Sequence, residues 1–113
     1  MDAFTIPDLL EEQRRRAQLY YEFLRVPCMS AGLYVLAPSA TDPQQPHSED
    51  ELYVVIQGQG YIQVAGESRT VTTGTLVFVP AGVPHHFHTI SEELQVLVLF
   101  APAEYSQATQ GPA

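Results

Sequence analysis

The stretch PHSEDELYVVIQG, residues 46–58, decides the fold and contains the first candidate site residues. Successive side chains of a β-strand point to opposite faces. Glu51, Tyr53 and Val55 would therefore share one face, and the apolar residues between them would share the other. An ionised glutamate on a buried, apolar face is costly unless it is paired or binds a metal. His47 lies four residues before Glu51, has the same strand parity, and could converge with it.

A second stretch, GTLVFVPAGVPHH at residues 74–86, places another histidine. The strand that follows Gly74 must end at Pro80, because proline cannot donate to a central ladder. The segment from Pro80 to Pro84 then forms a rigid turn that delivers His85 at a fixed point. Two histidines and one carboxylate can occupy one face of an octahedron and leave positions for water, substrate or dioxygen. The candidate metal-ligating residues from this pattern are His47, Glu51 and His85.

The rest of the chain predicts a small all-β domain with one helix. Pro7 suits a first helical turn, and acidic residues precede basic ones, so we expect a helix at about residues 7–17. Short segments rich in β-branched and aromatic residues, bounded by turn residues, are typical of strands in a sandwich or barrel. Gly66 indicates a hairpin turn. The predicted strands are residues 19–26, 31–38, 51–58, 60–66, 69–74, 75–81, 85–90 and 94–102.

The two stretches together resemble the motifs of the cupin superfamily. The first motif is glycine, five residues, His-x-His, three or four residues, glutamate, six residues, glycine. The second is glycine, five residues, Pro-x-Gly, two residues, histidine, three residues, asparagine. The matching residues are His47, Glu51 and Gly58 in the first motif and Gly74, Pro80, Gly82 and His85 in the second. This resemblance spans roughly half the chain and implies a small single-domain bacterial cupin, a double-stranded β-helix or jelly-roll barrel.

The sequence departs from the family motifs at three positions. Ser39 stands where the opening glycine would fall, and Thr89 replaces the final asparagine. Gln45 stands in place of the first histidine, so the usual four-ligand set is reduced to three. The amide oxygen of Gln45 could still coordinate weakly or hydrogen-bond a bound water. The resemblance implies a divalent cofactor, which would be iron, manganese, nickel or zinc.

Other residues near the motifs have two interpretations each. The two candidate histidines could instead hydrogen-bond Glu51 in a barrel that binds no metal. Tyr53 would point into the cavity, either as a packing residue or as a catalytic group beside Glu51, since some lyases of the superfamily use a tyrosine near this place. Strand parity puts His86 and His88 on the face opposite His85, at the surface or an interface. Glu49 and Asp50 are expected to be solvated or to form a turn.

Composition limits the partners that this chain can have. Its net charge is −8, with five arginines and no lysine, so nucleic acids and anionic membranes would be repelled. Cys28 is the only cysteine, which excludes an internal disulfide, and we expect it to be a buried small hydrophobe. The first residues lack the order of a signal peptide, which favours a cytoplasmic protein. Residues 1–113 form one predicted domain, with a barrel at about 19–103 and a frayed tail at about 104–113.

Members of this superfamily share a fold but differ in function, so two functions stay open for this chain. One is a metalloenzyme that acts on a small organic acid or enol-type substrate, dioxygenase-like or a lyase or isomerase, with Glu51 and Tyr53 as catalytic residues. The other is a non-catalytic cupin that binds a small molecule or metal for sensing or sequestration. The segment at residues 94–102 is apolar on both strand faces, which predicts a homodimer.

Overall fold

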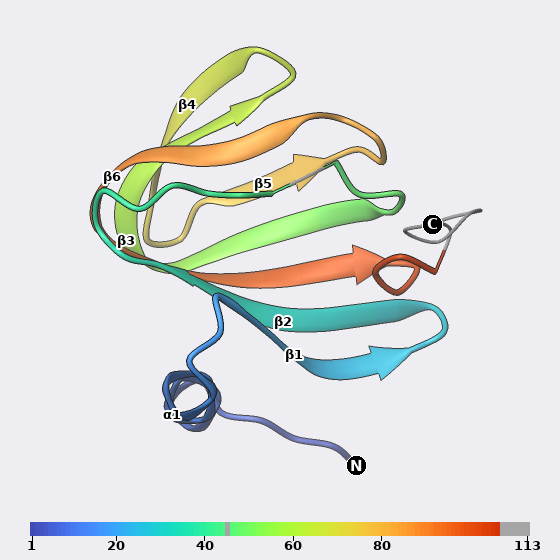
Figure 1. Ribbon diagram of the computed structural model, residues 1–113. Helices are drawn as coiled ribbons and strands as arrows, with labels where there is room; N and C mark the ends of the chain where they lie inside the picture. Colours follow the sequence, from blue (N-terminus) through green and yellow to red (C-terminus); the bar gives the residue numbers. More distant parts are fainter. Residues whose placement is uncertain (45, 107–113) are drawn as a thin grey trace.

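The computed structural model describes residues 1–44 and 46–106, and these residues form one short helix and a rolled antiparallel sheet (Figure 1). Every strand pair is antiparallel, and the order across the sheet is β1, β2, β6, β3, β4, with β5 paired to β3. This confirms the predicted all-β fold with an N-terminal helix. The elements are α1 (Ile6–Arg16), β1 (Tyr20–Val26), β2 (Met29–Leu36), β3 (Asp50–Val64), β4 (Glu67–Thr72), β5 (Leu76–Val79) and β6 (His85–Ala101).

The long strands β3 and β6 each join two of the predicted strands into one bent ribbon. Their pairing shifts register between Val55 and Tyr61, where Gly58 has a φ of +111°. A Cβ at Gly58 would lie 2.1 Å from the carbonyl oxygen of Glu93. The closing glycine of the first motif therefore lets the two strands approach closely where they bend. The bend turns the two halves of the ribbon toward each other, as Figure 1 shows.

The turns that the sequence predicted are present. Ala65 and Gly66 both have positive φ, 51° and 86°, and link β3 to β4 as a two-residue hairpin turn of the kind that matches strand twist. Strand β5 ends at Val79, directly before Pro80. The chain then turns and enters β6 at His85. Both turns fix the register of the strands beside the site.

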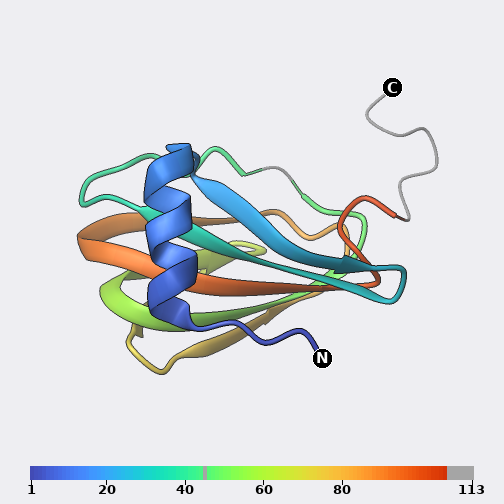
Figure 2. The ribbon, with the colours of Figure 1, turned by 90° about the horizontal axis from the view of Figure 1, so that it is seen from below.

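Helix α1 lies across β1 and β2, on the outside of the sheet (Figure 2). The Thr5 hydroxyl accepts a hydrogen bond from the backbone N–H of Asp8 at 3.3 Å and caps the first turn. Buried Gln13 donates through Nε2 to the carbonyl oxygens of residues 18 and 19. The helix begins and ends one residue before the predicted range. None of the helices in the described residues has the length and hydropathy needed to cross a membrane.

Side chains alternate across β3 as the sequence predicted. Glu51, Tyr53 and Val55 are buried on the inner face, whereas the residues between them are partly exposed on the outer face. The inner face holds the main apolar core, which includes Tyr34, Leu36, Tyr53, Val55, Ile62, Val71, Phe87, Leu94, Val96 and Phe100. The position of Glu51 at the edge of this core explains why its carboxylate needs specific partners.

One expectation about the ends of the barrel is wrong. Cys28 is exposed, because it lies in the turn between β1 and β2 rather than under a strand. The first residue of the predicted tail is anchored: the Glu104 N–H donates to Ser30 Oγ at 2.9 Å, and the Glu104 carbonyl accepts from Arg25 at 2.8 Å. These contacts hold the chain against the β1–β2 hairpin. Residues 107–113 of the predicted tail lie outside the described residues.

Candidate metal centre

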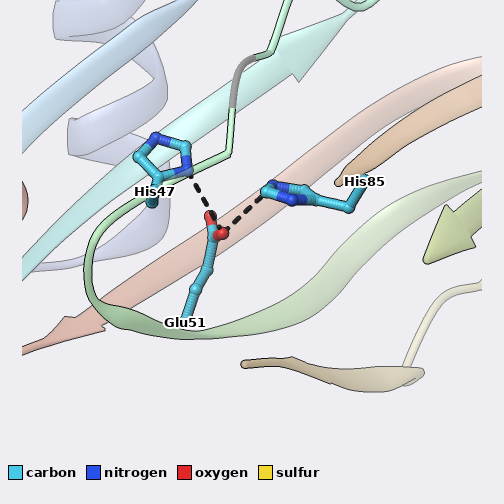
Figure 3. Close-up of side chains that lie close together, drawn as sticks. All are labelled: His47, Glu51 and His85. Atoms are coloured by element: carbon cyan, nitrogen blue, oxygen red, sulfur yellow. Dashed lines mark ion pairs between the residues drawn. The ribbon is translucent and has the colours of Figure 1, made fainter. Parts of the chain in front are cut away.

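Three side chains from two segments of the chain converge at one end of the barrel. Glu51 comes from the start of β3, His85 is the first residue of β6, and His47 lies in the loop before β3 rather than in the strand. Figure 3 shows the two imidazole rings on either side of the carboxylate. Glu51 Oε1 lies 3.1 Å from His85 Nε2 and 3.5 Å from His47 Nδ1. One ligand atom from each residue fits within a 4.8 Å cluster.

The turn before β6 fixes the orientation of His85. Its Nδ1 lies 2.9 Å from the carbonyl oxygen of Val83, which accepts the ring N–H. Its Nε2 therefore faces Glu51. The same turn is joined to the opposite loop, because the Gly82 N–H donates to the carbonyl oxygen of His47 at 2.7 Å. Both histidines are thus positioned by one connected piece of backbone.

His47 is held by aromatic packing and by a second carboxylate. Its ring centroid lies 4.7 Å from that of Phe100 and 5.5 Å from that of Tyr105. Its Nε2 lies 3.0 Å from Glu104 Oε2, on the side of the ring away from Glu51. The Nδ1 atom of His47 is therefore the one that faces the carboxylate of Glu51.

The central atoms of this cluster are buried. His47 is 8% exposed, Glu51 2% and His85 5%. Among the described residues, neither oxygen of Glu51 nor Nδ1 of His47 has a partner with hydrogen-bond geometry, despite the short distances between them. A buried polar group left in this state costs about 1–3 kcal/mol. Carboxylate oxygens and imidazole nitrogens that face a common point are a suitable donor set for a divalent cation, so these residues fit a metal.

The pKa values show how protons are shared in the metal-free cluster. Burial lowers the pKa of His47, but the carboxylates of Glu104 and Glu51 outweigh burial and raise it to about 9. Burial likewise lowers the pKa of His85, but Glu51 and the carbonyl of Val83 raise it above its usual value. Burial raises the pKa of Glu51, and the two histidines reverse this to a value below the usual one. Protons and a metal ion would therefore compete for this site.

Tyr53 lies beside the cluster and is fully buried. Its hydroxyl donates to Gln44 Oε1 at 2.6 Å, and the same oxygen lies 3.3 Å from His85 Nε2. Burial, and after it the charge of Glu51, raises the pKa of Tyr53 well above its usual value, so the hydroxyl stays protonated. The sequence did not single out Gln44, whose side chain also donates to Asp42 at 2.8 Å. Gln45, the candidate fourth ligand, lies outside the described residues.

The other polar residues of the motifs are placed elsewhere. His86 and His88 lie on the outer side of β6, as parity predicted, and the His88 ring stacks on Tyr61 with centroids 5.5 Å apart. Glu49 was expected to be solvated or to form a turn; it lies in a bend before β3, but it is buried and accepts from the Tyr105 N–H at 2.6 Å. Its burial depends on the chain after β6, which no local pattern reveals. Asp50 is exposed and accepts from the backbone N–H of Ala81.

A pocket of about 410 Å³ opens beside the cluster. Tyr20 lines it and packs directly over Gly32, where a Cβ would lie 2.3 Å from the tyrosine ring. The Tyr20 hydroxyl is buried and has no hydrogen-bond partner among the described residues. Burial, and after it the charge of Glu104, raises the pKa of Tyr20, so it stays a donor. The described lining residues are Leu19, Tyr20, Tyr34, Pro43, Gln44, His47, Glu51, Val98, Phe100, Glu104 and Tyr105, with no arginine or lysine among them.

Comparison with known proteins decides the family. A family model described as a cupin domain matches residues 32–102, which include both motifs. The chain belongs to the cupin family.

Relatives of this cupin support the same assignment. An uncharacterized protein of Streptomyces coelicolor is 47% identical over 104 residues, which cover 92% of this chain and 99% of the relative. The crystal structure of TT1209 from Thermus thermophilus is 23% identical, with a TM-score of 0.71 and coverage of 91% of this chain and 99% of that one. The crystal structure of the DMSP lyase DddQ from Ruegeria pomeroyi is 25% identical, with a TM-score of 0.63 and coverage of 67% and 39%. The predicted small cupin barrel is confirmed.

Proposed function

We propose that this cupin holds a divalent metal ion through His47 Nδ1, the Glu51 carboxylate and His85 Nε2, and that it acts on a small organic molecule in the adjoining pocket. The observation that carries the metal assignment is a set of buried atoms that have no partner within residues 1–44 and 46–106: both Glu51 oxygens and Nδ1 of His47. Each histidine also has an acceptor for its other ring nitrogen, which leaves one nitrogen of each ring directed at Glu51. A site without metal would not need both rings to be oriented in this way.

Imidazole and carboxylate ligands suit iron, manganese, nickel and zinc, so the donor set does not single out one of these metals. When bound, such an ion would supply Lewis acidity toward a substrate oxygen. Three protein ligands would leave positions for that oxygen and for water. The motif resemblance makes the Gln45 amide a candidate additional donor.

The chain's own residues place a hydrogen-bond donor beside this site. The Tyr53 hydroxyl lies on the same strand face as Glu51 and stays protonated, which suits a donor that stabilises negative charge. Gln44 orients it by accepting its hydrogen bond. This arrangement supports a lyase or isomerase more directly than a dioxygenase, and the similarity to the DMSP lyase DddQ points the same way. The catalytic residues of the proposal are Glu51 and Tyr53.

The pocket indicates which ligands would fit. Its volume lies in the range of small-molecule sites, and its wall includes four aromatic residues: Tyr20, Tyr34, Phe100 and Tyr105. The Tyr20 hydroxyl, which has no partner among the described residues, is available as a donor. Glu51 and Glu104 contribute negative charge, which His47 offsets only in part, and the described lining residues include no arginine or lysine. An uncharged molecule with a hydrogen-bond acceptor and an oxygen for the metal therefore suits this pocket better than a dianion.

A second candidate is a non-catalytic cupin that binds a metal or small molecule. It is favoured by the Tyr53 hydroxyl, which already has a full partner in Gln44 and so resembles a packing residue. The same pocket would then serve sensing or sequestration. The two functions share the metal site and differ only in turnover.

The experiment is to purify the protein without a histidine tag and measure bound metal. We expect about one equivalent, either as isolated or after addition of Fe(II), Mn(II), Ni(II) or Zn(II). Metal content well below one equivalent under all of these conditions would refute the proposal. Turnover assays with diketones, phenols and thiols, with dioxygen uptake recorded in parallel, then separate an oxygenase from a lyase or isomerase. A metal-loaded protein that binds ligands from this panel without converting them would be the non-catalytic cupin.

A further inference from the structure

The chain after β6 returns across the mouth of the pocket and is anchored through its backbone. We name residues 103–105 the C-terminal strap. The Ala103 N–H approaches the carbonyl oxygen of Pro27 at 3.4 Å, and the Glu104 N–H donates to Ser30 Oγ at 2.9 Å. Arg25 donates to the Glu104 carbonyl at 2.8 Å. These contacts leave the Glu104 side chain free to point inward.

That side chain is directed at the candidate metal centre. Glu104 is only 15% exposed at its side chain and lines the pocket. Its Oε2 lies 3.0 Å from His47 Nε2, the nitrogen that faces away from Glu51. The ring of Tyr105, the next residue, packs near the same imidazole, with centroids 5.5 Å apart. The strap therefore contacts His47 through both a carboxylate and a ring.

The chemistry of imidazole gives this contact a specific consequence. A neutral imidazole carries one N–H, and the acceptor that it meets decides which nitrogen keeps the proton. A carboxylate beside Nε2 keeps the proton there and leaves the lone pair of Nδ1 directed at Glu51. The Val83 carbonyl has the same effect on His85: it keeps the proton on Nδ1 and leaves the lone pair of Nε2 directed at Glu51. Outer acceptors of this kind raise the basicity of a ligating histidine and typically change metal affinity 10–100-fold.

We propose that Glu104 is a positioning residue of the metal centre, which holds His47 as the Nε2–H tautomer so that Nδ1 can bind the metal. This inference rests on the proposed function, since it assigns a role around the same three ligands. It makes the C-terminal strap part of the site, although the strap lies beyond both cupin motifs and contributes no metal ligand. The strap also explains why His47 can act as a ligand from a loop rather than a strand.

The first test measures Zn(II) affinity of the tag-free protein by competition with a chromogenic chelator. Glu104→Ala removes the acceptor but keeps the backbone anchors, and we expect affinity to fall about 10–100-fold. Glu104→Gln keeps an acceptor oxygen without the charge, and it should recover most of that loss. Glu92→Ala is the matched control, because Glu92 is an exposed glutamate on β6, and it should leave the affinity unchanged. A Glu104→Ala affinity within about twofold of the unmodified protein would overturn the inference.

The second test reads the tautomer directly. In ¹⁵N-histidine-labelled, zinc-loaded protein, two-bond ¹H–¹⁵N correlation spectra should show His47 protonated at Nε2 and metal-bound at Nδ1, and His85 the reverse. His47 bound through Nε2 would overturn the inference even if affinity depends on Glu104. The two proposals fail in distinguishable ways. If the unmodified protein binds none of Fe(II), Mn(II), Ni(II) and Zn(II), both fail; if it binds zinc and His47→Ala abolishes binding while Glu104→Ala leaves the affinity within about twofold, only the role of Glu104 fails.

Discussion

Replacing Glu51 by glutamine tests the metal site with the smallest change of shape. The side chain keeps its length and one carbonyl oxygen but loses its charge. Tetrahedral zinc sites with four protein ligands bind with about 10–16 kcal/mol, or roughly 2.5–4 kcal/mol for each ligand. Glu51 is the only carboxylate among the three proposed ligands, and its side chain is 1% exposed, so solvent hardly screens it. We expect Glu51→Gln to weaken Zn(II) binding by at least about 2.5 kcal/mol, which is roughly 60-fold.

The assay is isothermal titration calorimetry with Zn(II) and with Mn(II), on tag-free protein. Glu92→Gln serves as the control, because the same chemical change at an exposed position should leave affinity unaltered. Far-UV circular dichroism establishes that both variants are folded. An affinity for Glu51→Gln within about threefold of the unmodified protein would refute the assignment of Glu51 as a ligand.

Three further predictions address the cluster, the pocket and the outer face. In metal-free protein the pKa of His47 is about 9, above the ordinary histidine pKa near 6.5, so protonated His47 stabilises the folded state. This contribution is complete below pH 6.5, and the unfolding free energy should fall by up to about 3 kcal/mol as pH rises from 6.5 through 9. Urea titrations that show rising stability over this range would contradict the prediction. Metal affinity should rise over the same range, because protons are displaced. Tyr20→Phe removes a buried hydroxyl for which the described residues offer no partner, and it should leave the melting temperature unchanged or higher. Tyr34→Phe loses a hydrogen bond to Asp42 and should cost about 1 kcal/mol or more. Equal destabilisation by both would show that Tyr20 has a partner. On the outer face Phe78 is 58% exposed, and we predict that it pairs with a second copy of the chain. Sedimentation equilibrium should show a dimer, and Phe78→Glu should dissociate it. If the unsubstituted protein is already a monomer, this pairing is excluded.

The sequence predicted the centre of the site because its geometry is local. Parity along β3 places Glu51 and Tyr53 on one face, and the two prolines before His85 fix the point at which β6 begins. Long strands were harder to predict. The bend at Gly58 interrupts the alternation of apolar residues, so one continuous strand was interpreted as two.

The periphery of the site could not be predicted, because its contacts join segments that are distant in the chain. Parity distinguishes Glu51 from Asp50 within β3, but Glu49 lies before the strand begins, and it is buried through a contact with the Tyr105 backbone. Glu104 follows the last strand and carries no periodic signal. Its role depends on the β1–β2 hairpin, which also exposes Cys28 by placing it in the turn. The roles of these residues can be identified only from the folded structure, in which the distant segments are in contact.

The most direct measurement of the central claim is anomalous diffraction from crystals of the zinc-loaded protein, recorded at the zinc absorption edge. The account predicts one strong peak at the end of the barrel, about 2.0–2.2 Å from His47 Nδ1, a Glu51 oxygen and His85 Nε2. A fully loaded crystal with no peak between these three side chains, or with its peak at the outer histidines His86 and His88, would contradict it.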